Sequence, residues 1–328
     1  MKKAILRLVT LVCLAFLVFG TYQIGLAKEV VLYSSNQSEL IDMVSQGFEK
    51  KTGIKVSAVR MGTGEAMKRI QAEKDNPLGD LFWSGDIAVL DAAKKFFMPY
   101  KSPEARVLPV QYIEKDSLWI ATNVHIMIIM YNKKLVNEQE KPQTWADLLN
   151  PKWKGKIVMA NPEKSGSAYA KVYGVYKLYG WDGLKKLIAN AKILDSASLI
   201  WKGTAEGEYS IGMTIEYAAY RYIAGGSKDV GIIYPQEGAF AAPEGTAMIK
   251  NCKHPEETKA FIDYLLSKEV EKDIFEQHYR RPARPDVVAS VGLPKISDIK
   301  LFKGFDPIES SALEKEILKQ WKEIIISK

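Results

Sequence analysis

Short apolar runs alternate with amphipathic stretches along most of the chain. Residues 29–33, 54–59 and 80–83 form apolar runs of strand length, and the residues after the first two runs place apolar side chains at helical spacing. Strand, loop and helix in this order predict a mostly parallel sheet with helices on both of its faces.

The same alternation continues in the second half of the chain. It predicts strands over residues 156–160, 211–215 and 230–234, helices after Ser165 and Glu216, and further helices over residues 255–267, 269–279 and 312–326. Residues 118–131 form an extended run long enough to cross between domains, and the Gly-, Ala- and Pro-rich stretch 235–248 leads back. We therefore predict an α/β fold of two doubly wound lobes joined by two crossing strands. Lobe 1 takes residues 28–122 and 244–328, and lobe 2 takes residues 123–243.

The first 27 residues have the three-part layout of a secretory signal peptide. Basic residues precede an apolar run over 6–19, and small residues stand at the −3 and −1 positions before Lys28. The run is shorter than the ~20 residues that span a bilayer as a helix, which disfavours a retained membrane anchor. Cys13 follows Val12 in the middle of the run, which disfavours lipid attachment. We expect cleavage of residues 1–27 and a periplasmic location.

The charge of the chain limits the classes of molecule it can bind, and its cysteine content limits how the fold is held together. The chain carries 46 Lys and Arg against 39 Asp and Glu, a formal net charge of +7. The two signs are mixed, without a basic stripe interleaved with aromatics, so we expect no nucleic-acid partner, and the small positive excess is weakly in favour of a small anionic solute. Cys252 is the only cysteine after residue 27, so the fold must be held by its apolar core and not by an internal disulfide. We also expect a monomer.

No arrangement of residues indicates catalysis. The three histidines, His125, His254 and His278, lack the spacing of a helical metal site, and there is no Cys-x-x-Cys or Gly-x-Ser-x-Gly motif. We expect each histidine to be structural or solvated and the protein to be neither an enzyme nor a cofactor carrier. A secreted phosphoester hydrolase is the enzymatic alternative, and the lack of a metal cluster or activated nucleophile disfavours it.

Four predicted strand ends lead into loops of glycine and small polar residues. These loops are Ser34-Ser35-Asn36, Gly62-Thr63-Gly64, Ser84-Gly85-Asp86 and Ser165-Gly166-Ser167. In a doubly wound sheet, ligands lie beyond the carboxyl ends of the strands, where helix N-termini offer free N–H groups to an anion. Each loop taken alone is better explained as a helix cap. Four of them on one architecture favour a binding cleft.

Glu216 and Tyr217 begin a helix after a predicted strand of the second lobe. A carboxylate at this place could accept hydrogen bonds from sugar hydroxyls or an amine, and Tyr217 could stack or hydrogen-bond. The alternative is a first-turn glutamate that stabilises the helix dipole, with aromatic core residues behind it.

Several stretches resemble a known family. They are residues 30–35, 48–56, 79–83, 142–155, 156–162 and 234–238, of which TWADLLNPKWKG within 142–155 is the most specific. The chain is similar to the periplasmic solute-binding proteins of ABC importers, in the group that includes ferric-ion-binding proteins and relatives for sugar phosphates and phosphonates. The resemblance implies the two-lobed type II fold, closure of both lobes on a ligand, and an inner-membrane ABC permease as partner. A chemoreceptor ligand-sensor of the same fold is an alternative.

The resemblance is stronger to the organophosphate-binding relatives than to the ferric-binding ones. Ferric-binding members use a histidine after the first strand and two adjacent tyrosines, whereas this chain has Asn36-Gln37-Ser38 and Glu216-Tyr217, with Tyr220 a turn later. We expect a sugar phosphate or phosphonate as ligand; ferric iron, held by Glu216, Tyr217 and Tyr220, is the alternative. The expected ligand-binding residues are Ser34, Ser35, Asn36, Gly62, Thr63, Gly64, Ser84, Asn161, Lys164, Ser165, Gly166, Ser167, Glu216, Tyr217 and Glu237.

Overall fold

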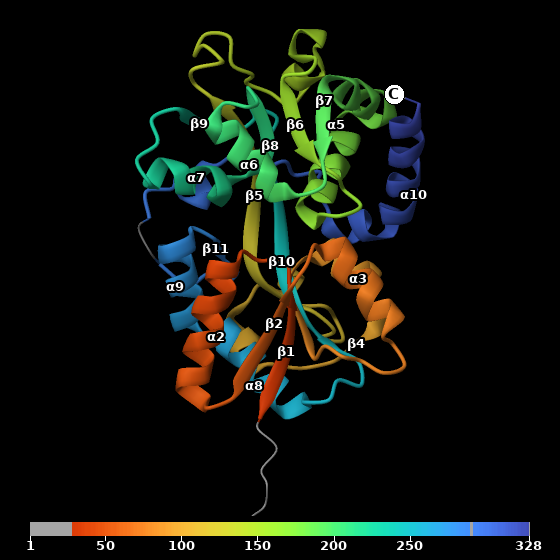
Figure 1. Cartoon of the computed structure of the whole chain (residues 1–328), viewed down its shortest axis with the longest axis vertical. Coiled ribbons are helices and arrows are strands. Elements are labelled where there is room, and N and C mark those ends of the chain that lie inside the picture. The colour runs from red at the N-terminus through yellow and green to blue at the C-terminus, as the bar shows by residue number, and fades with distance from the viewer. Residues whose placement is uncertain (1–27, 289–290, 328) are drawn as a thin grey trace, which may run out of the picture.

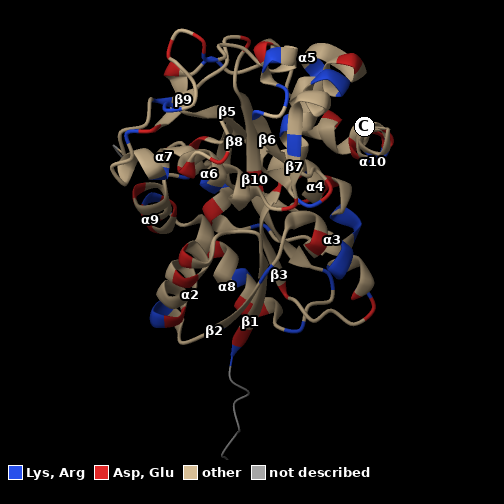
Figure 2. Cartoon of the chain, turned by 45° about the horizontal axis from the view of Figure 1, so that its top comes forward, with Lys and Arg blue, Asp and Glu red and all other residues tan. Residues whose placement is uncertain are grey.

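The computed structural model describes residues 28–288 and 291–327. The predicted signal peptide, residues 1–27, lies outside the described residues. Figure 1 shows two lobes that follow one another along the longest axis, with two long strands running between them. Figure 2 shows Lys, Arg, Asp and Glu interspersed over both lobes, in agreement with the mixed charges of the sequence. Within the described ranges, no helix is long and apolar enough to cross a membrane.

Lobe 1 contains a parallel sheet in the order β2-β1-β3. Its strands are β1 (Glu29–Ser34), β2 (Lys55–Arg60) and β3 (Leu81–Asp86), and its helices are α2 (Ser38–Thr52), α3 (Thr63–Ala72), α4 (Ile87–Ala92), α8 (Pro255–Leu266) and α9 (Lys268–His278). Alternate residues of β1 are fully buried, and Leu40, Val44 and Phe48 of α2 join them in one apolar cluster. The three parallel strands therefore end at the same edge of this lobe.

Lobe 2 is built in the same way around the order β8-β6-β7. Its strands are β6 (Ile157–Ala160), β7 (Ala191–Leu194), β8 (Ile211–Ile215) and β9 (Val230–Ile233), and its helices are α5 (Gly166–Asn190), α6 (Ala197–Glu206) and α7 (Glu216–Ala224). Gly180, at φ 62°, interrupts the helical geometry inside α5. The remaining elements are β4 (Phe97–Met98), β11 (Arg281–Pro282) and the 3₁₀ helices Lys94–Phe96, Pro103–Val107, Val110–Tyr112, Ala146–Leu149, Pro151–Trp153 and Ile296–Asp298.

The two strands that connect the lobes are β5 (Ile120–Asn132) and β10 (Phe240–Ile249). They pair with each other antiparallel; β10 continues to β3 in lobe 1, and β5 continues to β8 in lobe 2. One sheet therefore runs through the whole molecule in the order β2-β1-β3-β10-β5-β8-β6-β7. All thirteen residues of β5 are buried, as its apolar sequence predicts. The prediction of two crossing strands is confirmed.

The C-terminal helix contacts both lobes. We predicted residues 244–328 in lobe 1, and α10 (Pro307–Ile326) packs on α4 of lobe 1 and also on α5 of lobe 2. Ile317 and Trp321 lie in an apolar cluster that joins residues of lobe 2 to Ala88 and Val89 of α4, and the Tyr169 hydroxyl of α5 donates to the carbonyl of Ser310 at 2.5 Å. The apolar stripe predicted this helix, but a stripe does not specify which lobe it covers.

Candidate ligand-binding site

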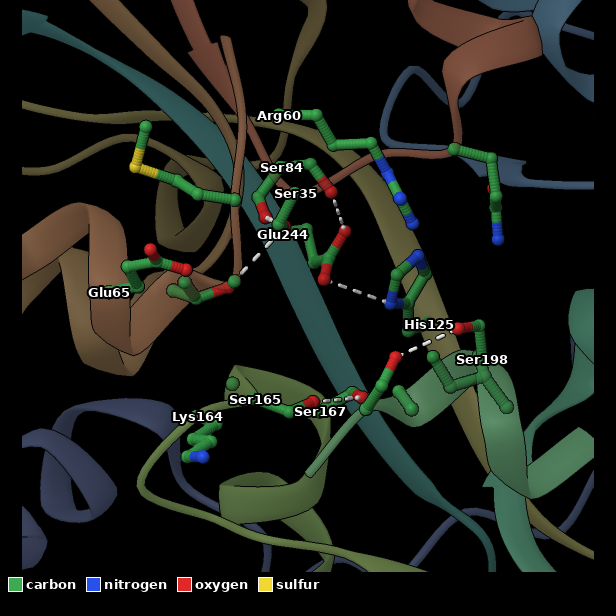
Figure 3. A pocket seen from close by; sticks show the side chains of 18 of the residues that line it. Ser35, Arg60, Glu65, Ser84, His125, Lys164, Ser165, Ser167, Ser198 and Glu244 are labelled. Carbon is green, nitrogen blue, oxygen red and sulfur yellow. Dashed lines mark hydrogen bonds and ion pairs between the residues drawn. The ribbon is translucent and has the colours of Figure 1, made fainter. Parts of the chain in front are cut away.

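A cavity of about 580 Å³ lies between the lobes. Ser35, Thr63 and Ser84 line it from lobe 1, and the loop before α5 lines it from lobe 2 together with residues 195–198. His125 and Glu244 enter it from the crossing strands β5 and β10 (Figure 3). The cavity therefore lies where the carboxyl ends of the parallel strands of both lobes meet, as expected for this class of sheet.

Three helices present their N-termini to the cavity. The cap residues Gly62 of α3, Ser165 of α5 and Ser196 of α6 all line it. Ser165 accepts from the Ala168 N–H at 3.4 Å, and its hydroxyl lies 3.2 Å from that of Ser167. The side chain of Ser196 does not cap its own helix. Free N–H groups, positive dipole ends and hydroxyls therefore converge on the cavity, and these are the groups that bind an anion at helix N-termini.

Most of the predicted binding residues line this cavity. They are Ser35, Gly62, Thr63, Ser84, Lys164, Ser165, Gly166, Ser167 and Tyr217. The Lys164 ammonium is 2.6 Å from Asp195, so its charge is already paired. The loops that the sequence indicated are therefore brought together from both lobes.

Four other predicted residues have structural roles beside the cavity instead of lining it. The Ser34 hydroxyl is fully buried and donates to the carbonyl of Trp83 at 2.9 Å. Asn36 is buried, and its backbone N–H donates to the Ser34 hydroxyl. Asn161 accepts from the Glu163 N–H at 3.0 Å and forms a turn. Gly64 lies against the backbone of Glu163 in the other lobe. These small polar residues build the loops without facing the cavity.

Glu216 and Glu237 were predicted to bind the ligand, but neither lines the cavity. The Glu216 carboxylate accepts two hydrogen bonds from Arg281, at 2.6 and 2.8 Å, and one from the Tyr234 hydroxyl at 2.6 Å. Glu237 accepts from the N–H groups of Trp145 and Ala146 and thereby caps a short 3₁₀ helix. Both carboxylates are committed to structural partners.

The alternative set of iron ligands is not assembled. Glu216 is paired with Arg281, and the Tyr220 hydroxyl donates to the Val291 carbonyl at 2.6 Å. Only Tyr217 of the three lines the cavity. Among residues 28–288 and 291–327, no group of three or more His, Cys, Asp and Glu is placed to hold a metal ion.

The sequence analysis missed a buried polar network on the wall of the cavity. The Ser84 hydroxyl donates to Glu244 Oε2 at 2.7 Å, and His125 Nδ1 lies 3.2 Å from Glu244 Oε1. Arg280 Nη1 is 3.1 Å from His125 Nε2, and Arg280 Nη2 donates to the Tyr217 hydroxyl at 2.9 Å and to Gln37 at 3.0 Å. The network therefore joins both lobes through the crossing strands.

The protonation states follow from the partners in this network. Burial lowers the pKa of His125 below its ordinary value although Glu244 opposes the shift, so the imidazole is neutral. Burial acts to raise the pKa of Glu244, but His125, Arg280 and the Ser84 hydroxyl hold it below its ordinary value, so the carboxylate is ionised. Because Nε2 of the neutral imidazole accepts from Arg280, its proton lies on Nδ1 and faces Glu244.

The lobes touch through backbone on one side of the cavity. A Cβ built at Gly62 would lie 2.6 Å from the carbonyl oxygen of Lys164, and one at Gly64 would lie 2.1 Å from that of Glu163. Gln37 of lobe 1 also donates to the Tyr217 hydroxyl of lobe 2 at 3.3 Å. The lobes are therefore in direct contact here, and glycine at these two positions permits the close approach.

Asp86 and Lys171 are buried in opposite lobes near this contact. Burial raises the pKa of Asp86 to about 8 and lowers that of Lys171 to about 7, with Glu244 and Glu314 as the other charges that act on Asp86. The unfolded Asp86 carboxyl releases its proton near pH 4, so folding takes up a proton between pH 4 and 8, and the contribution of Asp86 to stability falls as pH rises through that window.

Replacing Asp86 removes the loss of stability that its ionisation causes at high pH. Asp86→Asn is expected to raise stability relative to the wild type, with a gain that grows from pH 5 to pH 8 and then levels off. Urea unfolding of both proteins at pH 5, 7 and 9 measures the difference. A gain that is the same at all three pH values would show that Asp86 is ionised in the folded protein.

Comparison with known proteins gives consistent matches. A family model described as bacterial extracellular solute-binding protein matches residues 76–303. A putative 2-aminoethylphosphonate-binding periplasmic protein of Salmonella typhimurium is 27% identical over 259 residues, 74% of each chain. Iron uptake protein A1 of Synechocystis sp. is 26% identical over 296 residues, 83% of this chain and 79% of that protein.

A solved structure matches the whole fold. The periplasmic binding protein AfuA from Actinobacillus pleuropneumoniae, with exogenous fructose-6-phosphate bound, gives a TM-score of 0.85 at 25% identity and covers 91% of this chain and 98% of its own. The two-lobed arrangement with two crossing strands is thus the type II fold of periplasmic binding proteins.

Proposed function

Because the chain belongs to the family of bacterial extracellular solute-binding proteins, we propose that it captures a small phosphorylated solute, a sugar phosphate or a phosphonate, and delivers it to an ABC permease. Family members are typically periplasmic and hand small solutes to permeases; they are solute-binding proteins and not enzymes. In this proposal the protein acts as a periplasmic monomer, and binding energy shifts an equilibrium between open and closed lobes without driving chemistry.

The convergence of three helix N-termini on one cavity carries the proposal. The N-termini of α3, α5 and α6 and the hydroxyls of Ser165 and Ser167 supply donors for the three oxygens of a phosphoryl group. A cavity of about 580 Å³ falls within the ~300–1,000 Å³ range of small-molecule sites and has room for a group attached to the phosphate. The 2-aminoethylphosphonate-binding relative and the fructose-6-phosphate complex support this ligand class.

Ferric iron is the second candidate because one relative is an iron uptake protein. The site gives it less support. Tyr217 is buried, and burial raises the pKa of its phenol, which opposes the tyrosinate form that binds Fe(III). Glu216 and Tyr220 face other partners.

A ligand panel tests the proposal directly. Purified protein lacking residues 1–27 is titrated calorimetrically with fructose 6-phosphate, 2-aminoethylphosphonate, sulfate and chelated ferric iron. We expect saturable binding of at least one of the two organic phosphorus compounds and none of iron. Binding of iron alone, abolished by excess chelator, would contradict the proposal.

Removing the two hydroxyls at the start of α5 tests where the phosphoryl group binds. Ser165→Ala/Ser167→Ala is expected to weaken binding of the phosphorylated ligand by about 10- to 30-fold, because two donors to a charged acceptor are lost while the backbone N–H groups remain. Titration calorimetry measures the change. Ser297→Ala, which removes an exposed hydroxyl outside the cavity, is the control.

Ser165 also caps α5, so its loss lowers stability by about 1 kcal/mol. Ser167→Ala alone keeps the cap and separates the two effects. Unchanged affinity in the double variant would remove this loop from the site.

A further inference from the structure

We propose that Glu244 selects among phosphorylated solutes: it accepts a hydrogen bond from a hydroxyl or ammonium group at the end of the ligand opposite the phosphoryl group. The inference rests on the proposed function and deepens it, because it defines the ligand class as phosphorylated solutes that carry a donor at their other end. No motif in the sequence marks this residue.

Glu244 is the buried carboxylate of the cavity. Four carboxylates line the cavity among the described residues, namely Glu65, Glu163, Asp195 and Glu244. Glu65 is exposed at the start of α3, Asp195 is paired with Lys164 at 2.6 Å, and Glu163 is paired with Lys322 at 2.8 Å. The Glu244 side chain is only 7% exposed, and Figure 3 shows it directed into the cavity between Ser84 and His125.

The carboxylate keeps acceptor capacity for a ligand. Ser84 donates to Oε2 at 2.7 Å, Arg280 Nη1 lies 3.5 Å from the same oxygen, and His125 Nδ1 lies 3.2 Å from Oε1. A carboxylate offers about four lone-pair sites, and of these contacts only the Ser84 bond is short. The Ser84 hydrogen bond fixes Oε2, and Oε1, which lies near His125 Nδ1, keeps room for a donor of the ligand. A pre-oriented acceptor on a buried wall discriminates between ligands more sharply than a flexible one.

The charge of Glu244 dictates which part of the ligand it meets. An ionised carboxylate beside a phosphoryl dianion would repel it in a site with little water to screen the charges. The phosphoryl group therefore binds at the N-termini of α3, α5 and α6, and Figure 3 shows Ser165 and Ser167 separated from Glu244 across the cavity. An ion without a donor, such as sulfate, meets the repulsion and gains nothing in return.

Two pairs of matched probes test the inference. Each pair has one compound with a donor and one without: fructose 6-phosphate with methyl phosphate, and 2-aminoethylphosphonate with ethylphosphonate. Their dissociation constants are measured by calorimetry for the wild type and for Glu244→Gln, which keeps the shape of the side chain and removes its charge. We expect the donor-bearing probes to bind Glu244→Gln at least about 10-fold more weakly and the donor-free probes to bind equally well or more tightly. Loss for only one pair identifies the donor as a hydroxyl or as an ammonium group.

The controls separate selection from a structural role. Glu316→Gln changes an exposed carboxylate of α10 outside the cavity and should alter all four affinities by less than about twofold. If Glu244→Gln unfolds, Glu244→Asp takes its place. It keeps the charge but withdraws the carboxylate by one methylene, and it should likewise weaken the donor-bearing probes more than the donor-free ones. Equal weakening of both members of each pair, or no change in either, would overturn the inference alone. Wild-type protein that binds none of the four probes would overturn the proposed function and this inference with it.

Discussion

A Gly64→Ala protein is expected to bind the phosphorylated ligand about 100-fold more weakly than the wild type while remaining folded. The added Cβ would lie 2.1 Å from the carbonyl oxygen of Glu163, which belongs to the backbone of the other lobe and cannot rotate away. The lobes must therefore stay apart at this contact. Separated lobes withdraw the N-terminus of α3 from a ligand held by α5 and α6. The apparent affinity then falls by the same factor as the population of the closed form.

Stability and affinity should change independently in this variant. Alanine is favoured over glycine in a helix by up to about 1 kcal/mol, so α3 itself is not weakened. Gln71→Ala, an exposed position at the other end of α3, is the matched control for helix propensity. Small-angle scattering with saturating ligand should show the wild type compact and Gly64→Ala extended. Wild-type affinity in Gly64→Ala would show that the closed contact does not form on binding.

Glu216→Ala is expected to lower the stability of the protein by about 3–5 kcal/mol. The Glu216 and Arg281 side chains are 2% and 8% exposed, and the variant leaves the guanidinium buried without its counter-charge. It also leaves the Tyr234 hydroxyl without its acceptor. For a chain of this size, such a loss lowers the melting temperature by about 5–15 °C, which differential scanning calorimetry measures.

A rescue variant separates the missing charge from lost packing. Glu216→Leu/Arg281→Met removes both charges and should recover much of the lost stability, because an apolar pair of similar volume replaces a buried ion pair at little cost. Ligand affinity below the melting temperature should change by less than about threefold in both variants, because Glu216 does not line the cavity. A large loss of affinity with unchanged melting would instead support the role predicted from sequence.

Local patterns were enough to predict the architecture and several of the loops that line the cavity. Helices that begin with Gly62-Thr63-Gly64 and Ser165-Gly166-Ser167 follow directly from strand, loop and helix periods, and a parallel sheet brings such loops to one edge. The same patterns do not reveal which way each side chain turns. Glu216 and Tyr217 are neighbours on one helix turn, yet Glu216 faces Arg281 and Tyr217 faces the cavity.

The missed residues depend on long-range pairing. Arg280 reaches Gln37 and His125 from 243 and 155 positions away, and no local period reports such a contact. One signal was available. His125 and Glu244 are the ionisable residues within two otherwise apolar or neutral strands, and buried charges require partners. Antiparallel pairing of those strands, with Ala242 opposite His125, places the two side chains close together.

The connectivity of the two lobes also bears on how such proteins diversify. The chain between the two crossing strands, residues 133–239, is one uninterrupted segment, and it carries Ser165, Ser167 and Tyr217. Recombination at two points, one in each crossing strand, would therefore exchange half of the recognition surface as a cassette. The exception is α10, whose Glu309 bonds to Tyr173 and Lys177 inside that segment. A stable chimera must therefore take its C-terminal helix from the same parent protein as the segment 133–239.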